Sequence, residues 1–233
     1  MMIALYSPFA YSMHIMEGLL PPFWAIAWSV LSLPVIIIGL ASIKKKVALN
    51  PRFKLLLAMV TAFAFLVSSL KLPSVAGSCS HLTGVGLGAI MFGPSAMSIV
   101  GLVVLIFQAL LLAHGGIATL GANVFSMGIA GPFLAYAVFV LLRKKIKAPL
   151  GVAVFSAAFL GDLFTYVITS FELAFAFPAE VGGIMASLAK FMSIFAVTQI
   201  PLAVVEGLLT VIIINLLVKN SHDEMLELGV INE

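Results

Sequence analysis

Charged residues are the class that this sequence has least of. Only 9% of its 233 residues are Asp, Glu, Lys or Arg, while 63% are hydrophobic. A soluble domain carries about 25% charged residues, so the polar surface here is too small to cover a water-facing globule. This composition excludes an ordinary soluble enzyme or nucleic-acid-binding protein. A single cysteine also excludes a disulfide framework.

Motifs for nucleotide binding and hydrolysis are also missing. The sequence has no Gly-Lys dipeptide and therefore no G-x-x-x-x-G-K-[ST] phosphate loop. It has no G-x-S-x-G or H-E-x-x-H pattern either. We therefore expect no enzyme activity in this chain, and any ATP-driven step would need another subunit.

Long apolar runs dominate the sequence. Unsatisfied backbone groups are costly in hydrocarbon, and runs of about 20 apolar residues fit membrane-spanning helices. The sequence predicts an all-α fold, a polytopic transmembrane helix bundle in one domain over residues 13–218, with a polar cytoplasmic tail at 219–233. The predicted runs are Phe23–Ile43, Arg52–Leu72, Gly84–Ala113, Gly115–Leu142, Leu150–Phe171 and Ile184–Val218.

The third run is too long for one crossing. As a single helix its 30 residues would extend about 45 Å, against a hydrocarbon core of about 30 Å. Gly93-Pro94-Ser95 lies inside it, and proline interrupts helical hydrogen bonding, so we expect a short helix, a turn and a second helix. The total is then about seven crossings. Pro132 and Pro201 are expected to mark either further kinks or helix ends.

Clusters of cations predict the orientation of the bundle. Positive residues favour the cytoplasmic side, which places the ends near Lys44–Lys46, Arg52, Arg143–Lys147 and Lys219 inside the cell. Residues 13–22 and the polar loop 73–83 then lie on the outer face of the cell (inner) membrane.

Residues 1–12 are apolar but too short to span a membrane, and they contain no Lys or Arg. Ala10-Tyr11-Ser12 matches the small-residue pattern of signal-peptide cleavage. Three interpretations stay open: a cleaved signal peptide, translation beginning at Met13, or a retained apolar tail. The first two give a mature chain with an outer-face amino terminus that begins Met13-His14.

Such a terminus would be a chelating unit. The amine of Met13, the deprotonated amide nitrogen of His14 and its imidazole can reach one ion, and nitrogen donors suit Co²⁺, Ni²⁺, Cu²⁺ and Zn²⁺. The predicted topology brings His14, His81 and His114 to the same face. Each alone could be an interfacial histidine bonded to backbone or water, but the set predicts a metal site. Cys79, His114 and Asn123 are expected to lie beside the ligands, and His222 in solvent.

Charged residues inside the apolar runs leave other functions open. Asp162, Lys190 and Glu206 could couple ion movement in a stand-alone secondary transporter, or pair with each other or with another subunit. A metal-dependent membrane enzyme is a third hypothesis, although no base or nucleophile is paired with the histidines in sequence. A copper carrier is a further alternative, because the chain has 11 methionines.

Three segments resemble the CbiM-type cobalt transport proteins over about residues 13–215. They are Met13-His14-Ile15-Met16-Glu17-Gly18-Leu19-Leu20-Pro21-Pro22, Gly77-Ser78-Cys79-Ser80-His81-Leu82-Thr83-Gly84, and His114-Gly115-Gly116 through Leu120-Gly121-Ala122-Asn123. The related nickel-binding proteins usually read Met-His-Ile-Pro-Asp-Gly, so Met16-Glu17 is similar to the cobalt branch. Leu82 departs from a frequent proline, and residues 1–12 precede the motif.

The resemblance implies a function and a ligand set. It implies the substrate-binding component of an energy-coupling-factor importer that captures Co²⁺ for cobalamin synthesis, with Ni²⁺ as the alternative cargo and no organic cofactor. It implies ligands at the Met13 amine, at the amide and imidazole of His14, and at His81. The implied partners are a CbiN-like small membrane protein, a CbiQ-like coupling protein and CbiO-like ATPase subunits.

Overall fold

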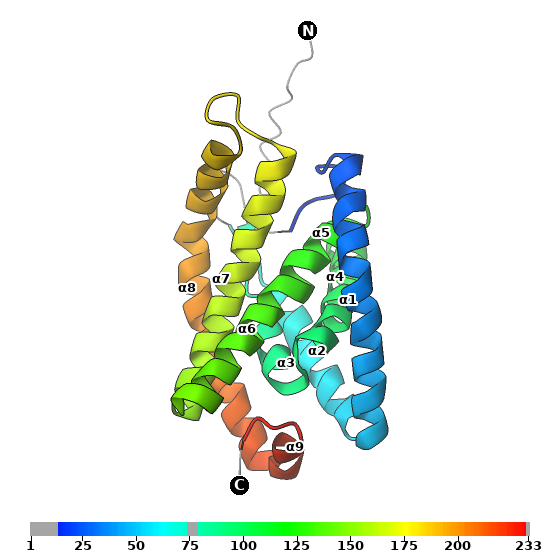
Figure 1. Cartoon of the computed structure of the whole chain (residues 1–233), viewed down its shortest axis with the longest axis vertical. Helices are drawn as coiled ribbons and strands as arrows, with labels where there is room; N and C mark the ends of the chain where they lie inside the picture. The colour runs from blue at the N-terminus through cyan, green and yellow to red at the C-terminus, as the bar shows by residue number, and fades with distance from the viewer. Residues whose placement is uncertain (1–13, 74–78, 232–233) are drawn as a thin grey trace.

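The protein is an elongated bundle of helices in a computed structural model that describes residues 14–73 and 79–231 (Figure 1). Within that part of the chain, five helical spans are long and apolar enough to cross a membrane. They are α1 (Pro22–Leu49), α4 (Pro94–Leu112), the continuous span Leu120–Ile146, α7 (Leu150–Ala176) and α8 (Gly183–Asn220). The all-α bundle predicted from the sequence is confirmed.

Two shorter helices complete the predicted segments. α2 (Phe53–Ser69) has 17 residues, and α3 (Val85–Phe92) has 8 residues, all of them buried. The break predicted at Gly93-Pro94 is confirmed, since α3 ends at Phe92 and Pro94 begins α4. An eight-residue helix is only about 12 Å long, so α3 does not cross the membrane alone. The chain reaches it through an extended stretch, called here the His81 segment (residues 79–84).

The His81 segment begins with a short strand. β1 (Leu72–Pro73) and β2 (Cys79–Ser80) pair antiparallel, with Leu72 opposite Ser80. Gly84 then starts α3 with a φ of 69°, a left-handed conformation that favours glycine. A Cβ at Gly84 would lie 2.7 Å from the Cα of Ala64, so the segment packs directly on α2.

Prolines inside the long helices do not end them. The span Leu120–Ile146 runs through α5 (Leu120–Asn123), the π-helical η2 (Val124–Ala130), α6 (Gly131–Val140) and the π-helical η3 (Leu141–Ile146). Pro132 lies just after η2, where a wider turn accommodates a residue without an N–H group. Pro201 lies within α8, so both prolines are internal to continuous helical spans.

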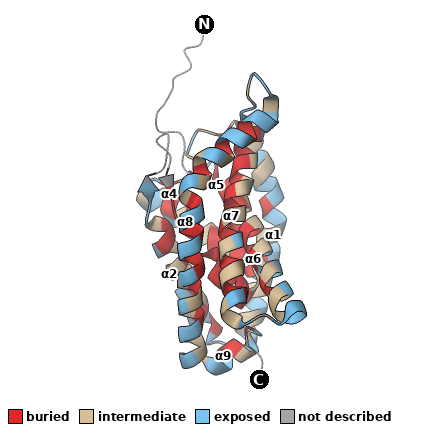
Figure 2. Ribbon diagram, turned by 90° about the vertical axis from the view of Figure 1, so that its left-hand side faces the viewer, coloured by how far each residue is buried: buried red, intermediate tan, exposed pale blue. Residues whose placement is uncertain are grey.

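Buried residues fill the interior of the bundle, and exposed residues cover the outward faces of the helices (Figure 2). Exposed side chains on α1 include Ile26, Val30 and Ile37, as expected for a helix that faces lipid. Glycines allow the closest approaches in the interior. A Cβ at Gly101 would lie 2.7 Å from the Cα of Gly128, which brings α4 against η2.

The carboxyl-terminal tail folds back on the bundle. It forms α9 (His222–Glu227), whose Met225 is buried, while His222 is exposed as expected. Arg52 Nη1 lies 3.1 Å from Glu224 Oε1, so α9 contacts the turn between α1 and α2. Arg143, Lys144 and Lys147 line a pocket with Gly229 and Val230. These cations and Arg52 therefore lie at the α9 end of the bundle, opposite the end where α1 begins (Figure 1).

Candidate metal centre

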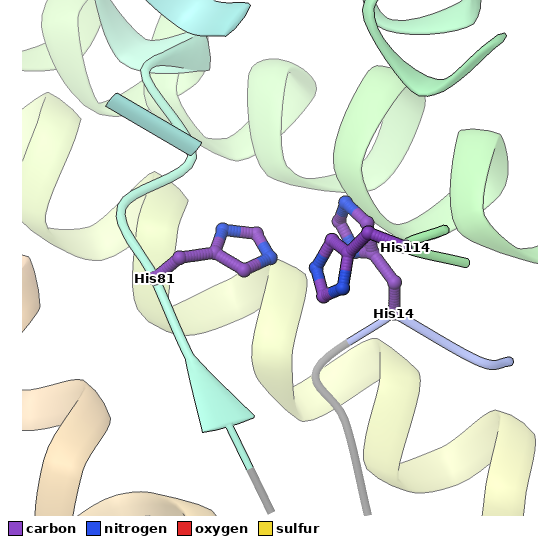
Figure 3. Close-up of side chains that lie close together, drawn as sticks. All are labelled: His14, His81 and His114. Carbon is purple, nitrogen blue, oxygen red and sulfur yellow. The ribbon is translucent and has the colours of Figure 1, made fainter. Parts of the chain in front are cut away.

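Three histidines from distant parts of the chain meet inside the bundle. His14, His81 and His114 are 2%, 0% and 4% exposed, and each offers a ring nitrogen within 4.8 Å of the others. His14 precedes α1, His81 follows β2, and His114 follows the end of α4. Figure 3 shows the His81 ring pointing across toward the other two rings. The structure thus brings together the three histidines that topology had assigned to one face.

The hydrogen bond of His81 fixes which of its nitrogens is free. Its Nδ1 lies 2.8 Å from the carbonyl oxygen of Leu82, which can only accept, so Nδ1 carries the proton. Nε2 therefore carries a lone pair, and it has no hydrogen-bond partner among the described residues. A buried, unpartnered imidazole nitrogen is suited to bind a metal ion.

A chain of hydrogen bonds fixes the tautomer of His14 in the same way. The hydroxyl of Ser68 donates to the carbonyl of Ala64, and it accepts from Gln108 Nε2 at 2.7 Å. Gln108 therefore turns its Oε1 toward His14 Nε2, at 2.9 Å, and this Nε2 must donate. The lone pair of His14 is then on Nδ1, the nitrogen nearer to its own backbone.

His114 belongs to the same cluster rather than to its surroundings. Ala113 takes a left-handed φ of 47° after α4, and the amide of His114 donates to the Gln108 carbonyl at 3.1 Å. This turn directs the ring of His114 to 4.6 Å from that of His14, measured between centroids. Its Nε2 has no hydrogen-bond partner in the described part of the chain.

All three imidazoles are held neutral. Burial lowers the pKa of His81 to about 4 and that of His114 to about 2, the nearby His81 adding to the effect on His114. Burial also lowers the pKa of His14 well below its usual value, with further repulsion from His81 and His114. Neutral imidazole is the form that binds metals, so the cluster is ready to bind near neutral pH.

The segment after His14 is anchored to residues 115–123. Asn123 accepts a hydrogen bond from the amide of Ile15 at 2.8 Å and donates to the Ile15 carbonyl at 3.0 Å. Thr119 also donates to that carbonyl, at 2.6 Å, and the amide of Glu17 donates to the Gly115 carbonyl at 3.2 Å. Asn123 thus holds the backbone beside His14.

Two residues named from the sequence lie outside this description. Met13, the proposed amine ligand, precedes the described residues, and the side chain of Cys79 is not described. They stay predictions.

The charged residues expected in the membrane are not part of the cluster of three histidines. Asp162 and Glu206 are fully buried and contact each other. Asp162 also accepts a hydrogen bond from Gln199, and Glu206 accepts one from Thr83. Lys190 is exposed. Sequence reasoning missed Gln199 and Thr83, and it missed Glu172, a further fully buried carboxyl. For Gln199 and Glu172 the available signal was a polar side chain within or beside an apolar run.

Comparison with known proteins agrees with this arrangement. Residues 14–224 match the family described as "CbiM: Cobalt uptake substrate-specific transmembrane region". The cobalt transport protein CbiM of Chlorobium limicola is 63% identical over 209 residues, which cover 90% of this chain and 82% of that protein. CbiM of Thermosipho melanesiensis is 56% identical over 98% of this chain and 96% of its own length.

A solved structure has the same fold. A crystal structure described as a transition metal transporter superposes with a TM-score of 0.77 at 26% identity, covering 91% of this chain and 96% of the other. The family match, the curated relatives and the fold agree, and the chain belongs to the CbiM family of cobalt-uptake transmembrane proteins.

Proposed function

We propose that this cobalt transport component is the substrate-binding subunit of an ATP-driven energy-coupling-factor importer. It captures Co²⁺ at the outer face of the cell membrane and supplies it for cobalamin synthesis. The observation that carries the proposal is the buried cluster of neutral imidazoles, in which the Nε2 atoms of His81 and His114 have no hydrogen-bond partner among the described residues.

The proposed ligands are the Met13 amine, the amide nitrogen and Nδ1 of His14, and Nε2 of His81. The tautomers support this set. Nδ1 of His14 and the amide nitrogen of the same residue would close a six-membered chelate ring with the metal. Gln108 bonds to Nε2 of His14 and therefore leaves Nδ1 free. His81 presents Nε2 because its Nδ1 donates to Leu82. Nitrogen donors favour Co²⁺ and Ni²⁺ over Mg²⁺, which prefers oxygen.

The proposed orientation follows from the two ends of the bundle. The cation clusters lie at the α9 end, and positive residues favour the cytoplasm, so the histidines open outward. Because this chain has no phosphate loop, ATP hydrolysis belongs to CbiO-like subunits acting through a CbiQ-like coupling protein. A CbiN-like small membrane protein completes the proposed assembly.

Metal titration of detergent-purified protein with a verified Met13 terminus tests the proposal. We expect the protein to bind one Co²⁺, and we expect His14→Ala and His81→Ala to lose binding. His222→Ala is the matched control, because His222 is exposed on α9. The proposal is wrong if the Met13-terminated protein binds neither Co²⁺ nor Ni²⁺, or if working protein in membranes still carries Met1.

Nickel as the cargo and a stand-alone secondary transporter are the competing hypotheses. The same nitrogen ligands accept Ni²⁺, and affinity orders favour Ni²⁺ over Co²⁺, so competition for uptake in cells separates the two cargoes. The buried carboxyls of Asp162 and Glu206 are the observation that favours a secondary transporter. Uptake that persists without any ATPase subunit, but stops when the ion gradient is removed, would support that alternative.

A further inference from the structure

The His81 segment brings non-helical backbone into the buried interior of the bundle. Residues 80–84 are buried, yet none of them is helical, so their N–H and C=O groups need partners from elsewhere. In a helix these groups bond within the helix itself. Here the partners decide how deep His81 lies and where its ring points.

Glu206 of α8 is the partner of two of these backbone groups and of one side chain. Its Oε2 accepts hydrogen bonds from the amide of Thr83 at 2.6 Å and from the amide of Gly84 at 3.0 Å. Its Oε1 accepts from the Thr83 hydroxyl at 2.9 Å. One fully buried carboxyl group thus holds the backbone two and three residues after His81.

Two further residues of α8 hold the start of the segment. Gln199 Nε2 donates to the carbonyl of His81 at 3.2 Å and to Asp162 Oδ2 of α7 at 2.6 Å. The Thr198 hydroxyl lies 2.7 Å from the Ser80 hydroxyl. His81 is therefore bracketed on both sides by hydrogen bonds to a single helix.

The other two histidines belong to a different part of the bundle. His14 bonds to Gln108 of α4, and the residue after it bonds to Asn123 of α5, while His114 lies two residues after the end of α4. Figure 3 shows His81 facing these two rings from the segment that follows β2. The cluster is thus divided between α4 and α5 on one side and α8 on the other.

We infer that Glu206 is the positioning residue of His81, binding the His81 segment to α8 so that the imidazole meets the other two. It acts through Thr83 and Gly84 and does not touch the ring. The inference rests on the proposed metal site, because positioning is measured by what the site binds. A displacement of α8 would withdraw His81 from ligands that stay with α4 and α5.

Co²⁺ binding to the Met13-terminated protein tests this inference. Loss of a hydrogen-bonded group that orients a metal ligand lowers affinity about 10-fold to 100-fold, and we expect this loss for Glu206→Ala. The visible absorption bands of bound Co²⁺ should also change, because His81 no longer holds its place. Glu206→Gln keeps one acceptor oxygen and should fall between Glu206→Ala and the unmodified protein.

A second pair of variants tests the same contact from the other side. Thr83→Val removes the hydroxyl that donates to Glu206, whereas Thr83→Ser keeps it. We expect Thr83→Val to lower Co²⁺ affinity and Thr83→Ser to restore it. Glu172→Gln is the matched control, since Glu172 is an equally buried carboxyl with no hydrogen-bond partner among the described residues.

The outcomes separate this inference from the proposed function. If the unmodified protein binds no metal, or His81→Ala binds normally, the proposed function fails. If His81→Ala loses binding while Glu206→Ala keeps the unmodified affinity and spectrum, the inference on Glu206 is overturned. If Glu206→Ala does not fold, unchanged affinity and spectrum in Thr83→Val overturn it instead.

Discussion

The pH dependence of Co²⁺ affinity distinguishes the proposed ligands from a site made of imidazoles alone. Protons compete with a metal only at donors that are protonated in the working range. Burial lowers the pKa of His81 to about 4 and that of His114 to about 2, so at pH 5.5 both rings are already neutral. Burial lowers the pKa of His14 well below its ordinary value as well. The histidines therefore contribute little pH dependence above pH 5.5.

The proposed amine and amide donors behave differently. An α-amine has an ordinary pKa of about 7.7 to 8.0. Raising the pH from about 5.5 to 7.5 therefore increases the unprotonated fraction of the amine about 60-fold. The amide of His14 must also release one proton when it binds the metal. This release multiplies the rise in affinity by about 100 over the same two pH units. The sign is the same for both donors, and affinity should rise between about 10³-fold and 10⁴-fold.

Competition titrations of the Met13-terminated protein, with a chelator of known pH dependence, measure this rise. Acetylation of the amino terminus is the matched perturbation, because it removes the amine and leaves the three histidines in place. A rise of about 60-fold would mean that the amide stays protonated. An affinity that hardly changes across the range, and is insensitive to acetylation, would refute the amine chelate.

Three further predictions follow from named contacts. Gln108→Leu frees the tautomer of His14 and should weaken Co²⁺ binding about 10-fold to 100-fold in a calorimetric titration, with unchanged binding contradicting the assigned tautomer. Gly101→Ala places a methyl group against the backbone of η2 and should lower the free energy of unfolding by about 1–3 kcal/mol. Gly151→Ala, with 3.8 Å to the nearest atom, should leave the melting temperature in detergent unchanged, and equal effects of the two would refute the packing argument. The metal-free protein should lose stability as the pH falls from about 6.5 toward 4, because His81 takes up a proton in the unfolded chain but not when it is buried in the folded protein. A melting temperature that stays level over this range would contradict this prediction.

Most of the fold could be predicted from local sequence patterns. A chain in lipid has to satisfy its backbone hydrogen bonds within each segment, so apolar runs translate directly into helices. The break at Gly93-Pro94 was predictable because proline cannot continue the hydrogen-bond ladder. The short length of α3 was predictable as well, because the apolar run begins at Gly84 and breaks at Gly93-Pro94. The buried course of the His81 segment was not, because it depends on partners in α8.

The candidate site could be predicted only in part. The number of predicted membrane crossings between them places His14, His81 and His114 on one face of the membrane. It does not predict how close together they lie. His114 was expected beside the ligands, and its ring centroid lies 5.1 Å from that of His81. The left-handed turn at Ala113 that directs His114 inward has no signature in composition or hydropathy.

The sequence by itself determined a membrane bundle, its helical segments and the face on which the histidines gather, because hydrophobic length and charge position are local properties. Only the tertiary structure decided which groups hold those histidines in place. Gln108 meets His14 across 94 residues, and Glu206 meets Thr83 across 123. Such pairs form when whole helices pack, since a buried polar group takes its partner from the helix that lies beside it.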